Sequence, residues 1–144
     1  MKRHTKLRDN FYSMNLHYGK TNLRLDRTVA FFFIVQHPCS EEFIHEQVLQ
    51  LLMSQCKDNN FYGDSSKQWA VGFQKTEDLL QPSDKREKIA FNKFWDCIDD
   101  FVNELAFMLS LRPIVPFDVY LIYDDEEIYK TVLKRLEARN NSQQ

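Results

Sequence analysis

The most apolar part of the chain is the segment 28–36, in which nearly every residue is apolar and most are β-branched or aromatic. Such a short run, followed by a break at Pro38, is typical of a central strand that is covered on both faces of its sheet. Residues 117–123 have the same character and predict a second strand. The chain is therefore expected to contain a β-sheet with a buried centre.

Two other segments alternate between apolar and polar residues, which is the pattern of a half-buried strand. In residues 11–18 the alternation precedes a predicted turn at Gly19, and apolar residues at 23 and 25 resume it, which predicts a hairpin. In residues 68–75, Trp69, Val71 and Phe73 fall on one side, which predicts another strand.

Three segments show the apolar spacing of helices: 41–56, 84–110 and 125–139. The first follows Ser40, a favourable N-cap, and the last carries acidic residues at its start and basic residues towards its end. If unbroken, the segment 84–110 forms a helix about 40 Å long. The polar segment 57–67 is expected to be a loop.

This order of elements predicts an α+β two-layer sandwich, with an antiparallel or mixed sheet and the helices on one face. If residues 60–62 hide a short strand, the core is ferredoxin-like with an extra N-terminal hairpin. The length of 144 residues suits one domain. We expect a basic flexible arm over 1–10, a single domain over 11–139 and a tail over 140–144.

The composition excludes a disordered chain, because 43% of the residues are hydrophobic and 14% are aromatic. No apolar run is long enough to span a bilayer, and no apolar segment follows the basic N-terminus as in a secretory signal. The three cysteines lie in apolar patterns and are expected to be reduced. These features predict a cytoplasmic protein.

Charge is distributed unevenly along the chain. Residues 1–28 contain seven basic and two acidic residues, whereas residues 95–127 contain nine acidic residues and one basic residue. Four acids of the predicted long helix share one face: Asp96, Asp99, Asp100 and Glu104. They form either a solvated face that is balanced by bases elsewhere or a docking surface for a basic protein partner.

Phe61 and Tyr62 lie in the middle of the predicted polar loop. Either they fold back onto the core as a lid, or they are exposed and anchor a binding partner. Together with the four acids, they are the residues that we expect to bind a partner.

The basic N-terminus offers a second class of function, nucleic-acid binding, against the alternative of a solubilising arm. Arginines would contact phosphates and tyrosines would stack on bases. The residues concerned are Arg3, Arg8, Tyr12, Tyr18, Arg24 and Arg27. A sequence pI of about 6.1 speaks against a dedicated nucleic-acid binder.

No glycine-rich phosphate loop, nucleophile elbow or dinucleotide motif occurs in the sequence. Cys39 with His37 or His45 is a conceivable nucleophile pair, but a packing role is the commoner one for such a cysteine. The spacing of His37, Cys39, His45 and Cys56 matches no zinc pattern. We therefore expect no catalytic residues, metal or cofactor, and a non-catalytic interaction module of the inhibitor, immunity or adaptor type.

Overall fold

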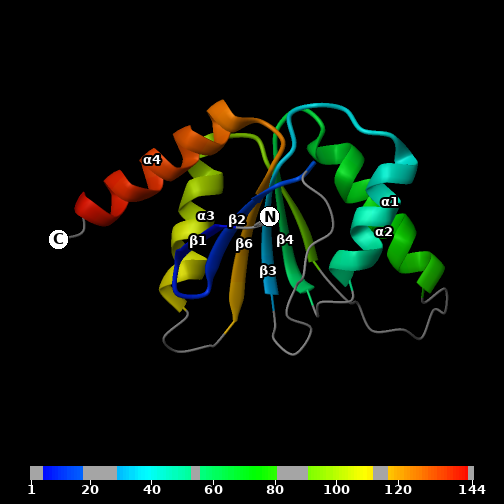
Figure 1. The fold of residues 1–144 in the computed structure, drawn as a ribbon, viewed down its shortest axis with the longest axis horizontal. Helices are drawn as coiled ribbons and strands as arrows, with labels where there is room; N and C mark the ends of the chain where they lie inside the picture. Colours follow the sequence, from blue (N-terminus) through cyan, green and yellow to red (C-terminus); the bar gives the residue numbers. More distant parts are fainter. Residues whose placement is uncertain (1–4, 18–28, 53–55, 81–90, 112–116, 143–144) are drawn as a thin grey trace.

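The computed structural model describes residues 5–17, 29–52, 56–80, 91–111 and 117–142. Six strands and four helices lie within these ranges (Figure 1). The strands are β1 (Thr5–Arg8), β2 (Phe11–Asn15), β3 (Val29–Ile34), β4 (Cys56–Tyr62), β5 (Phe91–Trp95) and β6 (Asp118–Tyr123). The helices are α1 (Glu41–Leu52), α2 (Ser66–Leu80), α3 (Ile98–Leu111) and α4 (Glu126–Ser142).

The strands form one mixed sheet in the order β1-β2-β6-β3-β4-β5. β1 pairs antiparallel with β2, and the other neighbouring pairs are parallel. β3 lies between β6 and β4, and its side chains from Phe31 to Ile34 are fully buried. The strands predicted over 28–36 and 117–123 are thus confirmed, and so is the strand that begins at Phe11.

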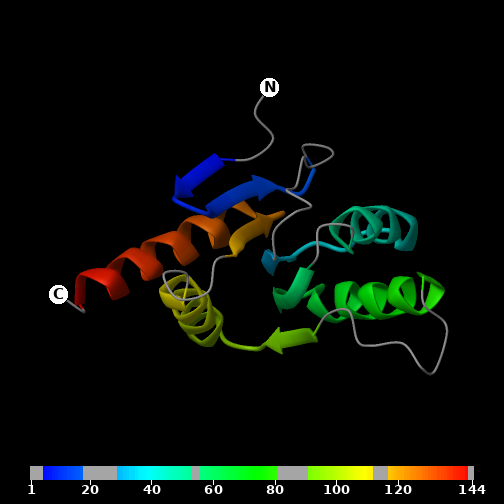
Figure 2. The same cartoon turned by 90° about the horizontal axis from the view of Figure 1, so that it is seen from below.

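Helices cover both faces of the sheet (Figures 1 and 2). Phe31 and Phe33 of β3 pack against α1 and α2, whereas Phe32 and Ile34 pack against α3 and α4. The predicted α+β sandwich with a mixed sheet is confirmed, but its helices are not confined to one face. Neighbouring parallel strands must be joined by crossover connections. Because these crossovers are right-handed, those that run in opposite directions along the sheet lie on opposite faces of it. The parallel order also differs from a ferredoxin-like arrangement.

Residues 56–80 differ from the prediction. The segment expected to be a loop forms β4, and the predicted strand 68–75 lies within α2. In α2, Trp69, Ala70 and Phe73 are buried at helical spacing, while Val71 is 52% exposed, so the alternation was incidental. The polar residues that suggested a loop are accommodated inside the sheet, where Asn60 accepts a hydrogen bond from the indole of Trp95 at 2.9 Å.

The helix predicted over 84–110 is wrong in its first half. β5 ends at Trp95, and α3 begins at Ile98 after a bend at residues 96–97; residues 81–90 lie outside the described ranges. Phe94 and Trp95 precede Ile98 by four and three residues, so the apolar positions of the strand are in phase with those of the helix. Pairing with β4, which no local pattern reveals, makes the first segment a strand.

The N-terminal residues 5–8 do not belong to a flexible arm but form the edge strand β1. Asn10, with φ of 60°, makes the turn into β2, a conformation that asparagine tolerates. The return strand predicted at residues 23–25 lies outside the described ranges. At the other end, α4 continues to Ser142, into the predicted tail. In the part of the chain that is described, no helix combines the length and apolar character needed to cross a membrane.

Candidate functional site

The acids predicted to share one helix face lie in different surroundings. Asp96 precedes α3, whereas Asp99 and Asp100 belong to its first turn. The carboxylate of Asp99 forms an ion pair with Arg135 of α4. The expected row of unpaired acids is therefore interrupted by one of the protein's own cations.

The fourth acid, Glu104, takes part in a partly buried polar cluster. The Nζ atom of Lys93 lies 3.4 Å from the Glu104 carboxylate and 3.2 Å from that of Asp58. Burial lowers the pKa of Lys93, but attraction and hydrogen bonding to the two carboxylates outweigh it, so the pKa is raised overall. This ion pair ties α3 to β4 and β5.

Acidic residues gather instead along the edge of the sheet at which the parallel strands end. α1, α3 and α4 begin at this edge, and carboxylates are favourable at helix N-termini because of the helix dipole. We call this surface the acidic edge. Its acids are Glu41, Glu42, Asp64, Asp96, Asp99, Asp100, Asp124, Asp125, Glu126 and Glu127.

Phe61 and Tyr62 are strand residues rather than loop residues. Phe61 is fully buried and stacks on Phe33 with ring centroids 4.9 Å apart. Tyr62 is half-buried against Phe101 of α3, at 5.6 Å. The prediction of an exposed anchor is wrong for Phe61, because β4 lies between β3 and β5 and its side chains fill the core.

The structure describes two of the six residues named for nucleic-acid binding. Tyr12 stacks on Tyr120 at 5.2 Å, so its ring packs within the protein. Arg8 is exposed, with its guanidinium 5.5 Å from the ring centre of Phe11. The others lie outside the described ranges: Arg3, Tyr18, Arg24 and Arg27.

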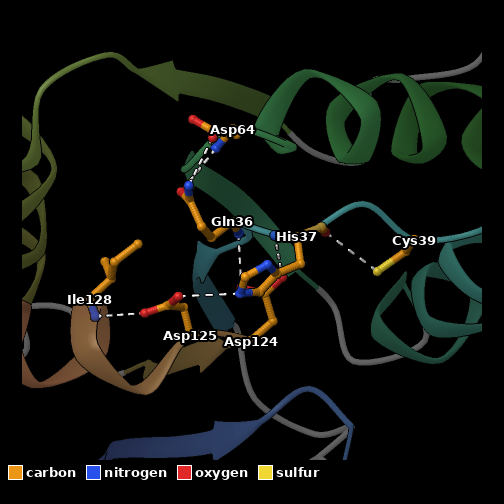
Figure 3. Close-up of polar contacts among 7 residues, drawn as sticks. All are labelled: Gln36, His37, Cys39, Asp64, Asp124, Asp125 and Ile128. Atoms are coloured by element: carbon orange, nitrogen blue, oxygen red, sulfur yellow. Dashed lines mark hydrogen bonds and ion pairs between the residues drawn. The ribbon is translucent and has the colours of Figure 1, made fainter.

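At the acidic edge, Asp124 ties the end of β6 to the end of β3 (Figure 3). Its two carboxylate oxygens accept hydrogen bonds from the backbone N–H groups of Gln36 and His37, at 2.8 and 2.9 Å. Crossovers leave β3 and β6 on opposite faces, and in open α/β sheets such a point is the usual place for a ligand. In this protein the Asp124 carboxylate lies at that point and holds the ends of β3 and β6 together.

His37 is largely exposed, with 60% of its side chain accessible, compared with 23% for Asp125. Its Nε2 atom lies 3.2 Å from Asp125, whose other oxygen accepts the backbone N–H of Ile128 and so caps α4 (Figure 3). The Cys39 thiol approaches the backbone carbonyl of His37, at 3.9 Å, rather than the imidazole. The Cys39 thiol and the His37 imidazole therefore do not form a nucleophile and base pair in this arrangement.

The remaining chemical candidates are engaged in packing. Burial, with a contribution from Asp124, raises the pKa of the Cys39 thiol above its ordinary value. The Nδ1 atom of His45 lies 3.0 Å from the hydroxyl of Thr76. No group of three or more potential ligands among the described residues is placed to hold a metal ion.

A feature that the sequence did not reveal is a groove of about 550 Å³ between α1 and α2. Its floor is formed where the helices touch, at Ile44 and Gly72. Its rim on α2 consists of residues spaced four apart, which face the same way on a helix. These rim residues are Lys67, Val71, Lys75 and Leu79.

The sequence contains the four-residue spacing of these rim residues. The alternating pattern over residues 68–75 instead predicts a strand with Val71 and Trp69 on the same buried side. In the helix the two side chains separate, and Trp69 is fully buried while Val71 lines the groove.

Comparison with family models, with curated proteins and with solved structures finds no match to this chain.

Proposed function

We propose that this chain is a non-catalytic interaction module of the cytoplasm that binds an amphipathic helix of a protein partner in the groove between α1 and α2. The observation that carries the proposal is the exposure of two large apolar side chains on the groove rim, Val71 at 52% and Leu79 at 72%. Apolar side chains exposed beside a groove are typical of helix-in-groove recognition. An apolar stripe on the partner would cover both residues.

The charges on the two rims define the partner further. Glu41 and Glu42 line the groove on the α1 side, and Lys67 and Lys75 line it on the α2 side. A partner helix would therefore carry basic residues on the flank that faces α1 and acidic residues on the other flank. Lys75 and Glu41 form an ion pair at 3.4 Å, but both are largely exposed, so exchanging it for contacts with a partner costs little.

The acidic edge supports a partner that is basic overall. α1 begins at this edge, so a helix in the groove lies beside its carboxylates. Clustered charge of one sign accelerates the association of an oppositely charged protein. Four acids were first predicted to attract a basic partner, and two of them form ion pairs within the protein: Asp99 with Arg135 and Glu104 with Lys93. Asp96 and Asp100 take part in neither of these ion pairs. This combination suits an inhibitor, an immunity-type protein or an adaptor.

The groove is tested with amphipathic helical peptides selected from a display library on the wild-type protein. We expect Val71→Glu and Leu79→Glu each to weaken the binding of a selected fluorescent peptide by about tenfold or more. Phe107→Glu is the matched control, because Phe107 is 55% exposed on α3, on the opposite face of the sheet. If no peptide is selected, or if the groove variants bind as tightly as the control, the proposal is wrong.

The acidic edge is tested with the same peptide extended by basic residues. The double change of Asp96→Lys and Asp100→Lys should slow its association and weaken the dependence of the rate on salt. Glu137→Lys, an exposed acid near the other end of α4, is the control. Equal association rates in the double variant and the wild type would contradict the proposed role of the acidic edge, but not the proposed binding of a helix in the groove.

A further inference from the structure

His45 lines the groove between α1 and α2, and one of its two ring nitrogens is already engaged there. Its Nδ1 atom lies 3.0 Å from the hydroxyl oxygen of Thr76, a residue of α2 that is only 1% exposed. The same hydroxyl donates a hydrogen bond to the backbone carbonyl of Gly72, one turn earlier in α2, at 2.9 Å. The imidazole, the hydroxyl and the carbonyl therefore form a short chain of hydrogen bonds between the two helices.

This chain of hydrogen bonds fixes the position of the imidazole proton. The Thr76 hydroxyl has one hydrogen, which it donates to the Gly72 carbonyl, so towards His45 it can act only as an acceptor. The Nδ1 atom of His45 must then carry the proton of the bond that joins the two side chains. In a neutral imidazole one nitrogen is a donor and the other an acceptor, so Nε2 is the acceptor. The neutral His45 side chain therefore offers a hydrogen-bond acceptor to a molecule in the groove.

The neighbouring acids of α1 give this acceptor a negative surrounding. Glu41 and Glu42 precede His45 by four and three residues, which places them on the same side of the helix, and all three residues line the groove. Lys75 forms its ion pair with Glu41, so the carboxylate of Glu42 is not part of that pair. A donor that approaches Nε2 along α1 meets this second acceptor nearby. Hydrogen bonds to a carboxylate are strongest when the donor is a cation.

We infer, on the basis of the proposed binding of a helix in the groove, that His45 selects a lysine or arginine of that helix. The cationic side chain donates one hydrogen bond to the Nε2 atom of His45 and another to the carboxylate of Glu42. Lysine and arginine have several N–H donors and no acceptor, so a single side chain can bond to both groups. Thr76 acts as a positioning residue, because it holds the imidazole ring and its proton without contacting the partner.

The position of the proton is tested on the chain without a ligand. Proton–nitrogen correlation NMR spectra distinguish the two neutral forms of an imidazole at about pH 8, where histidine side chains are ordinarily neutral. We expect the proton of His45 on Nδ1 in the wild type and in Thr76→Ser, which keeps the hydroxyl. In Thr76→Val, which lacks the acceptor, this preference should be lost. A proton on Nε2 in the wild type, or an unchanged preference in Thr76→Val, would overturn the inference.

The selection of a cation is tested with a helical peptide that has been selected on the wild type and carries the expected lysine or arginine. His45→Phe, which keeps a ring but has no acceptor, should weaken its binding by about tenfold. Replacing the basic residue of the peptide by norleucine should weaken binding to the wild type by a similar factor. With the norleucine peptide, His45→Phe should then have little further effect. Additive losses from the two changes, with circular dichroism showing the variant folded, would overturn the inference.

The selection experiment separates failure of this inference from failure of the proposed function. If the selected peptides depend on Val71 and Leu79 but share no basic residue at one position of their helix, His45 does not select a cation, although the groove still binds a helix. If no helical peptide is selected on the wild type, the proposed function is wrong, and the inferred role of His45 is wrong with it.

Discussion

The side chain of Ile44 lies so close to Gly72 that a Cβ atom on the glycine would stand 2.4 Å from its Cγ2 atom. Ile44 is buried and β-branched, so its methyl group has little freedom to move away. This contact sets the separation of α1 and α2 and therefore the depth of the groove between them. The glycine is needed here for close packing.

Gly72→Ala should destabilise the protein by about 1–3 kcal/mol. Overpacking at Ile44 outweighs the gain of roughly 0.5–1 kcal/mol that alanine brings to a helix. The measurement is urea unfolding followed by circular dichroism. In the double variant with Ile44→Ala, which removes the Cγ2 atom, the cost of Gly72→Ala should largely vanish. Strictly additive effects of the two changes would contradict the predicted clash.

Phe61→Ala should cost about 3–5 kcal/mol in the free energy of unfolding, because the ring is fully buried between β3 and α2. Tyr62→Ala should cost less, because Tyr62 is only half-buried. Chemical denaturation of the two variants compares them directly. Similar small effects for both residues would restore the interpretation of Phe61 as an exposed anchor.

Lys93→Met should reduce stability at neutral pH by about 1–2 kcal/mol, because it leaves the Asp58 and Glu104 carboxylates without their cation. The pKa of Lys93 is higher in the folded state, so the stabilisation is complete below the ordinary lysine value of about 10.4 and is lost as pH rises through the folded-state pKa. Unfolding free energies of wild type and variant should therefore converge at high pH. A difference that stays constant well above that value would contradict this account.

Cys39 should react with iodoacetamide more slowly than the exposed Cys97 at neutral pH. Burial raises the pKa of the Cys39 thiol, and the thiolate is the reactive form. Its rate should reach half of the maximum at a pH above the ordinary thiol value of about 8.5. Mass spectrometry of the alkylated peptides, with Cys97→Ser as the control, assigns the rates. Fast reaction of Cys39 at neutral pH would support an activated thiol instead.

Asp99→Asn and Asp100→Asn compare two neighbouring carboxylates at the start of α3. Both lose a favourable interaction with the helix dipole, but Asp99 also loses its ion pair with Arg135. Because that ion pair is exposed, the extra loss for Asp99→Asn should stay below about 1 kcal/mol. Thermal unfolding at low and high salt should show the difference shrinking as salt increases. A larger loss for Asp100→Asn would contradict the pairing.

Several elements follow from local patterns in the sequence. The apolar runs at 28–36 and 117–123 predict β3 and β6, because only strands buried on both faces contain so few polar residues. Ser40 and the two following acids predict the start of α1, and the Ser40 hydroxyl indeed accepts the backbone N–H of Phe43 at 3.1 Å. Patterns of this kind depend on neighbours within a few residues.

Only the tertiary structure decided the rest, because it depends on partners that are distant in the sequence. β4 and β5 are strands because they pair with each other and because β4 also pairs with β3. Local patterns suggest otherwise, since the polar residues of β4 indicate a loop and the apolar residues of β5 are in phase with helix α3. Ion pairs with Arg135 and Lys93 engage two of the acids predicted to form one row, Asp99 and Glu104. Arg8 and Arg139, from opposite ends of the chain, line one pocket. Hydrophobic spacing therefore determined where most core segments lie, whereas the parallel order of the strands determined which charges are neutralised and which surfaces remain open.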